Sequence, residues 1–143
     1  MSNKFHLALE AGNLEETLPF YTDVLGCDLG DSETGKWQDI DFWGNELTLH
    51  DSDDDILFFR RSQNKLSLDY FDNRQHEVDM GSVCVPHFGI WLETDDYFKV
   101  KESISSKWRF FDTEYIRFRG QDTEQRTFFV EDPAGNILEI KTK

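Results

Sequence analysis

The chain has 143 residues and a net charge of −14, and hydrophobic residues make up 38% of it. This length fits one domain with a substantial core, and 13 Phe and 4 Trp are typical of a globular protein rather than a disordered one. The negative charge excludes nucleic acid as a natural partner, because its phosphates would be repelled. No apolar run approaches membrane-spanning length, so we expect no membrane partner.

The cysteines and the start of the chain indicate the compartment. Cys27 and Cys84 form no metal-type spacing, so reduced thiols are the expectation. The first residues, Met1–His6, lead directly into a strand and leave no room for a signal peptide. We therefore expect a cytoplasmic protein whose partner is a small molecule.

The first half of the chain predicts a strand, a helix and three strands. The strand covers Lys4–Glu10, and Asn13 can cap the helix with Glu16 at the capping-box spacing. Gly26 ends that helix, while Pro19 in its interior predicts a kink or a late start. The three strands that follow are expected around Cys27–Leu29, Lys36–Trp43 and Glu46–His50.

A connector of about residues 52–83 then interrupts the periodicity, and Ile56–Phe59 within it could be a strand extension or a lid. Beyond the connector the order of elements repeats. A strand at Pro86–Leu92 precedes a helix that begins near Thr94. Three further strands are expected at about Thr113–Arg119, Gln125–Glu131 and Asn136–Lys141.

The last two of these strands flank a turn, Asp132–Asn136, in which Pro fixes φ and Gly supplies a positive φ. Glu139 follows the turn and points away from the face that its apolar neighbours bury. Three histidines have the same placement, since His6, His50 and His87 each lie opposite apolar neighbours in a strand. Taken alone, each could be an ordinary solvent-facing residue, but together they form a candidate ligand set.

The two halves also align directly, because Gly44–His50 matches Gly135–Lys141 in its first two residues and its apolar pattern. An internal repeat of this kind implies two modules that share a core. The sequence thus predicts an α+β fold in a single domain, 1–143, made of two βαβββ modules. Module one covers about 4–51, the connector about 52–83 and module two about 84–143.

Two βαβββ modules, a histidine on the first strand of each and D-P-x-G-N-x-L-E at residues 132–139 resemble the vicinal oxygen chelate superfamily. That superfamily includes glyoxalase, fosfomycin- and bleomycin-resistance proteins and extradiol dioxygenases. The resemblance covers nearly the whole chain except the connector. Val85–Gly89 and Ile116–Gly120, together with the last hairpin, look like a small group of predicted extradiol-type dioxygenases.

The resemblance implies that two curved mixed sheets form a cup around a divalent metal bound by His6, His87 and Glu139. The fourth ligand position of the superfamily falls on Thr48, which is a poor ligand. His50 is one pleat further, roughly 6–7 Å along the strand. It could act as an acid/base catalyst, or a bulge could bring it to the metal as a fourth ligand.

Two histidines and a carboxylate form the facial triad of non-haem Fe(II) oxygenases. The resemblance therefore implies Fe(II) as the bound metal, with Ni, Co, Zn or Mn as alternatives. The implied substrate is a catechol or another vicinal-oxygen compound. The residues that could bind it are Tyr115, Arg117 and Arg119, on one face of their strand, and the aromatic residues Trp43, Trp91 and Phe129. The basic residues could equally be surface charges, and the aromatic ones plain core.

The sequence is also compatible with two other functions. A four-ligand site completed by His50 would favour a metal-dependent isomerase or lyase of the glyoxalase kind. A metal-free binding protein, like the bleomycin-resistance proteins, is the second alternative, although the intact ligand set counts against it. Extradiol enzymes usually have a Tyr before the last Glu, whereas this chain offers only Phe128 and Phe129. Relatives of this length often form homodimers, in some of which the cup is built across two chains.

Overall fold

Two four-stranded sheets, with strand orders β1-β4-β3-β2 and β5-β8-β7-β6, form the frame of the protein. The structure is a computed structural model that describes residues 3–52, 87–104 and 109–143, with the side chains of 109–113 left out. The first sheet contains β1 (His6–Gly12), β2 (Asp28–Glu33), β3 (Trp37–Phe42) and β4 (Asn45–Asp51). The second contains β5 (His87–Trp91), β6 (Arg109–Arg117), β7 (Gln125–Glu131) and β8 (Ile137–Thr142).

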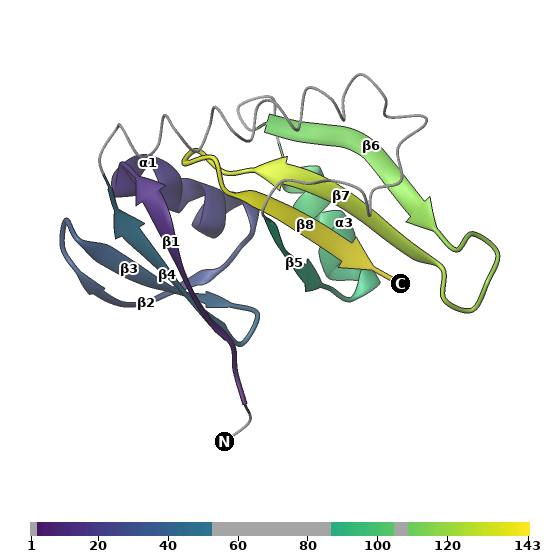
Figure 1. Cartoon of the computed structure of the whole chain (residues 1–143), viewed down its shortest axis with the longest axis horizontal. Coiled ribbons are helices and arrows are strands. Elements are labelled where there is room, and N and C mark those ends of the chain that lie inside the picture. Colours follow the sequence, from purple (N-terminus) through teal and green to yellow (C-terminus); the bar gives the residue numbers. More distant parts are fainter. Residues whose placement is uncertain (1–2, 53–86, 105–108) are drawn as a thin grey trace.

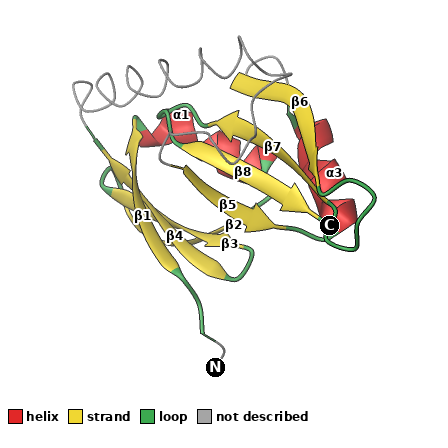
Figure 2. Cartoon of the chain, turned by 45° about the vertical axis from the view of Figure 1, so that its right-hand side comes forward, coloured by secondary structure: helices red, strands yellow, loops and turns green. Residues whose placement is uncertain are grey.

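The sheets have the same topology. The first strand of each, β1 or β5, runs parallel to the last, β4 or β8, and the remaining pairs are antiparallel. A helix follows the first strand in both modules: α1 (Leu14–Pro19) in module one and α3 (Thr94–Ser103) in module two. Figures 1 and 2 show the two sheets side by side, with α3 behind the second. The predicted α+β fold of two βαβββ modules with mixed sheets is confirmed, and it is consistent with a cup.

The first helix begins where the sequence predicts and then changes its winding. Asn13 accepts a hydrogen bond from the backbone N–H of Glu16 at 3.2 Å. After Pro19 the chain continues as a π-helix, η1 (Phe20–Val24), which suits the missing N–H of proline. Gly26, with a φ of +72°, ends it. The helix therefore begins at the predicted cap, Asn13, and the effect of Pro19 is a change from α-helix to π-helix.

Each sheet has one apolar face, and both apolar faces belong to a single core cluster. This cluster contains residues of the first sheet, the second sheet and the helices: Leu47, Leu49, Phe128, Val130, Leu138, Ile140, Tyr21 and Tyr97. Because strand side chains alternate, the opposite face of each sheet is directed away from this core. These two polar faces hold the candidate ligands His6, His50, His87 and Glu139.

The turn of the last hairpin also joins the two modules. Tyr21 of η1 donates a hydrogen bond of 2.7 Å to Asp132, and the Asn136 side chain donates one of 2.8 Å to the carbonyl of Glu10 in β1. Asp132 is buried, which raises the pKa of its carboxyl, while hydrogen bonds from Tyr21, Asn136 and the backbone of Ala134 act in the opposite direction. The D-P-A-G-N turn is thus a contact between modules as well as a hairpin.

Some predicted segments differ from the structure or lie outside it. β6 ends at Arg117, and Phe118 follows with a φ of +54°, so the strand alternation does not extend to Arg119. The connector, including Ile56–Phe59, lies outside the described residues. Cys27 is buried, and burial together with two nearby aspartates raises the pKa of its thiol to about 12. Among the described residues, no helix is long and apolar enough to cross a membrane.

Candidate metal centre

His87 and Glu139 come together on the polar face of the second sheet. Gly89, two residues after His87, pairs with Glu139 in the parallel ladder of β5 and β8. The Nε2 atom of His87 lies 3.5 Å from Oε1 of Glu139. A Cβ at Gly89 would lie 2.9 Å from the Glu139 carbonyl oxygen, so only glycine allows this approach without a shift.

The two oxygens of Glu139 have different neighbours. Oε1 faces His87, whereas Oε2 accepts a hydrogen bond of 2.7 Å from Thr127 and lies 3.8 Å from the ammonium of Lys141. Burial raises the pKa of Glu139, but the contacts with His87, Thr127 and Lys141 outweigh it and hold the pKa below its ordinary value. The carboxylate is therefore ionised and oriented, as a metal ligand has to be.

Phe129 supports the imidazole from the side. Its ring meets His87 edge to face, with centroids 5.2 Å apart, and its own side chain is buried. An edge-to-face contact is a favoured geometry for two aromatic rings, and it covers one side of the imidazole with apolar surface. Phe129, predicted as a pocket residue, thus lies next to the predicted ligand.

His6 lies on the polar face of the first sheet and has a carboxylate partner of its own. Its Nδ1 atom is 2.7 Å from Oε1 of Glu46, the residue beside it in the ladder of β1 and β4. Metal-binding histidines commonly use one nitrogen for a carboxylate and the other for the metal. The contact with Glu46 fits that pattern, in which Nε2 would be the nitrogen for a metal.

The register also locates the fourth ligand position. Ala8 pairs with Thr48 as Gly89 pairs with Glu139, so Thr48 is the counterpart of the carboxylate ligand. Its hydroxyl donates a hydrogen bond of 2.6 Å to Asp39 on the neighbouring strand. His50 is exposed one pleat further, and the ladder of β3 and β4 shows no bulge between Thr48 and His50.

Within the residues that the structure describes, the three predicted ligands do not form one group. The described residues contain no group of three His, Cys, Asp or Glu side chains that could hold a metal. His87 and Glu139 lie on one polar face and His6 on the other. The donor set of two imidazoles and a carboxylate still suits Fe(II), Mn, Co, Ni or Zn. The 3.5 Å between His87 and Glu139 is close to the roughly 3.0–3.5 Å that metal bonds of about 2.1 Å produce between neighbouring ligands.

The other predicted residues lie in two places. Tyr115 and Arg117 share the polar face of the second sheet, paired with Thr127 and Gln125 of β7. Trp43 occupies the turn between β3 and β4, with a φ of +47°, which is unusual for a bulky residue.

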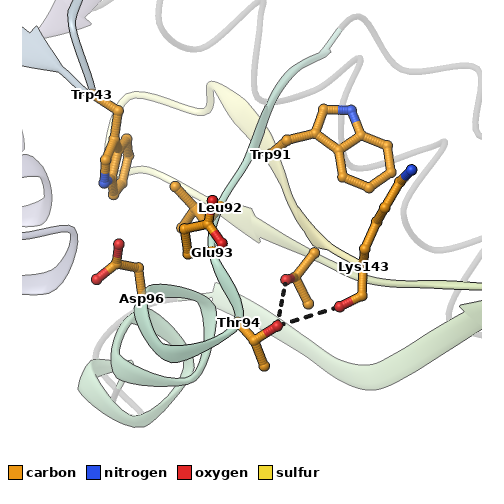
Figure 3. A pocket seen from close by; sticks show the side chains of 8 residues that line it. Trp43, Trp91, Leu92, Glu93, Thr94, Asp96 and Lys143 are labelled. Atoms are coloured by element: carbon orange, nitrogen blue, oxygen red, sulfur yellow. Dashed lines mark hydrogen bonds between the residues drawn. The ribbon is translucent and has the colours of Figure 1, made fainter.

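Trp43 and Trp91 line one pocket of about 460 Å³ near the start of α3 (Figure 3). In that pocket Thr94 bonds with Thr142 and the Lys143 carbonyl. The two tryptophans lie on opposite sides of this pocket, and Trp43 is in the turn rather than on the polar face of the first sheet.

Sequence reasoning missed four residues beside the predicted ligands: Thr127, Lys141, Glu46 and Asp39. Lys141 could have been found by alternation, because it is two residues after Glu139 and so on the same face. Thr127 and Asp39 required the register between strands, which no local pattern supplies.

Comparison with known proteins identifies the class. Residues 5–140 match the family model of the Glyoxalase/Bleomycin resistance protein/Dioxygenase superfamily, and the chain belongs to this superfamily. No curated protein sequence matched the chain.

Several solved structures share the fold. A glyoxalase/bleomycin resistance protein/dioxygenase from Alicyclobacillus acidocaldarius is 29% identical, with a TM-score of 0.64 over 99% of this chain and 91% of that one. FosX, a fosfomycin resistance protein from Listeria monocytogenes, is 14% identical, with a TM-score of 0.64 over 100% and 94%. Lactoylglutathione lyase from Agrobacterium tumefaciens is 15% identical, with a TM-score of 0.58 over 99% and 94%. A variant of the same FosX was solved with Mn(II) and 1S,2S-dihydroxypropylphosphonic acid.

Proposed function

We propose that this protein is a metal-dependent enzyme acting on a small molecule with two neighbouring oxygens, and that it is an Fe(II) dioxygenase of the extradiol type. The observation that carries the proposal is the asymmetry of the two sheets. Glu139 has His87 at 3.5 Å, whereas its counterpart Thr48 directs its hydroxyl to Asp39. Three protein ligands, His6, His87 and Glu139, leave several coordination positions open, as oxygenase chemistry requires.

We further propose that the cup closes between two copies of the chain. Both apolar faces are used in the shared core, so the polar faces of one chain are directed away from it. A second copy can place its His6 opposite the His87 and Glu139 of the first. A homodimer of this kind would contain two equal sites.

The roles of the surrounding residues follow from their positions. A bound metal would hold both substrate oxygens and, as Fe(II), supply the oxygen chemistry. Thr127 orients Glu139, and Glu46 orients His6. His50, exposed one pleat from Thr48, would accept a proton from the substrate hydroxyl. Tyr115 and Arg117, on the polar face of the second sheet, would bind a polar part of the substrate.

A second candidate function has one observation in its favour. Asp39 brings a carboxylate to the fourth ligand position through its 2.6 Å bond with Thr48. If Asp39 or His50 completed the site, four ligands would favour Ni, Co or Zn and an isomerase or lyase reaction of the glyoxalase kind. FosX and lactoylglutathione lyase share this fold, and FosX has been solved with Mn(II) and a vicinal diol.

The first experiment is elemental analysis of protein purified without oxygen, wild type beside His87→Ala. About one iron per chain, lost in the variant, would support the triad and lead to oxygen-consumption assays with catechols. Nickel, cobalt or zinc in place of iron would favour the isomerase or lyase. Absence of metal from the wild type after reconstitution would contradict both and favour a metal-free binding protein.

Mixed dimers test the shared site. His6→Ala and Glu139→Gln should each bind no metal alone. Co-expressed with two different tags and purified as the heterodimer, they should regain one metal per dimer, because His6 of one chain then meets Glu139 of the other. A heterodimer without metal, from a wild type that binds it, would place all ligands within one chain.

A further inference from the structure

Lys141 is an unusual cation on the polar face of the second sheet. Its side chain is 18% exposed, although lysine is among the residues least often buried. The ammonium lies 3.8 Å from Oε2 of Glu139 and 4.5 Å from the ring centre of Trp91. A cation–π contact and one carboxylate therefore hold it close to the candidate metal pair.

The neighbours of Lys141 form a row across four strands. Trp91, Lys141, Thr127 and Tyr115 are consecutive register partners from β5 to β6, and Arg117 begins the adjoining row. This face therefore has two basic side chains and a phenol within a few residues of Glu139. Such a grouping is distinctive in a chain with 29 acidic and 15 basic residues.

The Lys141 ammonium has capacity for another partner. Its distance from Glu139 exceeds that of a hydrogen bond, and within the part of the chain that the structure describes it donates none. Lysine has three N–H donors. If Oε1 of Glu139 binds a divalent cation, the charge of this carboxylate is shared, and the ammonium beside it then favours a further anion.

We propose that Lys141, together with Trp91, forms an anion subsite beside the metal centre, and that the substrate has a carboxylate next to its vicinal oxygens. The proposal rests on the proposed metal-dependent function and adds the substrate class to it. The ammonium lies 3.8 Å from Oε2 of Glu139, the carboxylate that would hold the metal through Oε1. The anionic group would therefore be only a few bonds from the chelated oxygens.

The test compares two probes that differ in charge: 3,4-dihydroxybenzoate and its neutral amide, 3,4-dihydroxybenzamide. Binding to Mn(II)-saturated protein is measured anaerobically by titration calorimetry, so that no turnover is needed. Wild type should bind the benzoate at least 10-fold more tightly than the amide. Lys141→Met should lose most of this preference and leave amide binding within about two-fold, whereas Lys141→Arg should keep the preference.

Lys99→Met, which removes an equal charge from the exposed surface of α3, is the matched control and should behave as wild type. Equal binding of both probes by wild type, binding of neither, or a preference that survives in Lys141→Met would overturn the subsite. The metal content of the same samples tests the proposed function separately. Protein that binds Mn(II) but has equal affinity for the two probes refutes only the subsite. Protein that binds no metal refutes the proposed function.

Discussion

The two polar faces are built on the same strand pairing and have different chemistry. In the second sheet the position opposite Gly89 is Glu139, which is 13% exposed and has contacts with His87, Thr127 and Lys141. In the first sheet the position opposite Ala8 is Thr48, which bonds with Asp39. A repeat therefore preserves backbone geometry while one copy keeps the carboxylate and the other does not.

The histidines of the two sheets also differ, in their exposure and in their contacts. His87 is 28% exposed and contacts Phe129, whereas the side chain of His6 is 56% exposed and lies 2.7 Å from Glu46. The difference supports the proposed division of the site, in which the second sheet would supply His87 and Glu139 and a partner chain would supply His6.

Removing the carboxylate that distinguishes the sheets should have the largest effect. Glu139→Gln keeps the shape and replaces an anionic ligand with a neutral one, so we expect metal affinity to fall by more than about 100-fold. Thr48→Val, at the equivalent position of the first sheet, should change affinity by less than about five-fold. Competition with a fluorescent chelator measures both. Equal losses in the two variants would mean that Thr48 is also at the metal.

The hydroxyl that orients Glu139 gives a smaller, second test. Thr127 is fully buried and its bond to Oε2 is 2.7 Å long. Thr127→Val is nearly isosteric but cannot donate, so metal affinity should fall by about 10–100-fold. Thr127→Ser keeps the donor and should stay within a few-fold of wild type. If both variants bind metal alike, the hydroxyl has no orienting role.

Strand alternation explains how far the sequence could predict this site. The sheet faces on which His6, His87 and Glu139 lie follow from the alternation of side chains along a strand. This alternation depends only on neighbouring residues, so the sequence predicts it. The alignment of the repeats likewise located Thr48. Contacts between strands, such as that of Thr127 with Glu139, depend on register and turn geometry, which no short segment contains.

The wrong predictions for Trp43 and Arg119 have a common cause, which is a residue with positive φ at the end of a strand. Trp43 was expected to continue a strand, but the turn to Gly44 requires a positive φ at a bulky residue. Arg119 was expected on the face of Tyr115, but the chain leaves the strand at Phe118. The module topology was predictable because it repeats. The direction in which the two polar faces point was not predictable, because it results from the packing of both sheets in one core.

The helices offer a comparison of stability between the modules. Tyr21 in η1 bonds with buried Asp132 across the module boundary at 2.7 Å, whereas Tyr97 in α3 bonds with Glu114 at 2.8 Å within its own module. Tyr21→Phe removes a hydrogen-bond partner from the buried carboxyl group of Asp132, and we expect a loss of about 1–3 kcal/mol in the free energy of unfolding.

Tyr97→Phe should cost less, about 0.5–1.5 kcal/mol, because Glu114 keeps Lys101 and Arg126. Urea denaturation followed by tryptophan fluorescence measures both variants. A larger loss for Tyr97→Phe than for Tyr21→Phe would contradict the role of the D-P-A-G-N turn as the joint between modules.

The smallest expected effect is a pH dependence confined to the helix side of the second sheet. Burial raises the pKa of Glu114, but bonds from Tyr97, Lys101 and Arg126 outweigh it and place the pKa below the ordinary 4.5. A carboxyl whose pKa is lower in the folded state stabilises the protein above its unfolded pKa and loses that contribution as pH falls through the folded value. Glu114→Gln should therefore reduce the free energy of unfolding near pH 7 and approach wild type below pH 4.5. Glu102→Gln, on the exposed side of α3, should remain parallel to wild type throughout. If the Glu114→Gln difference persists unchanged in acid, lost packing rather than charge explains it.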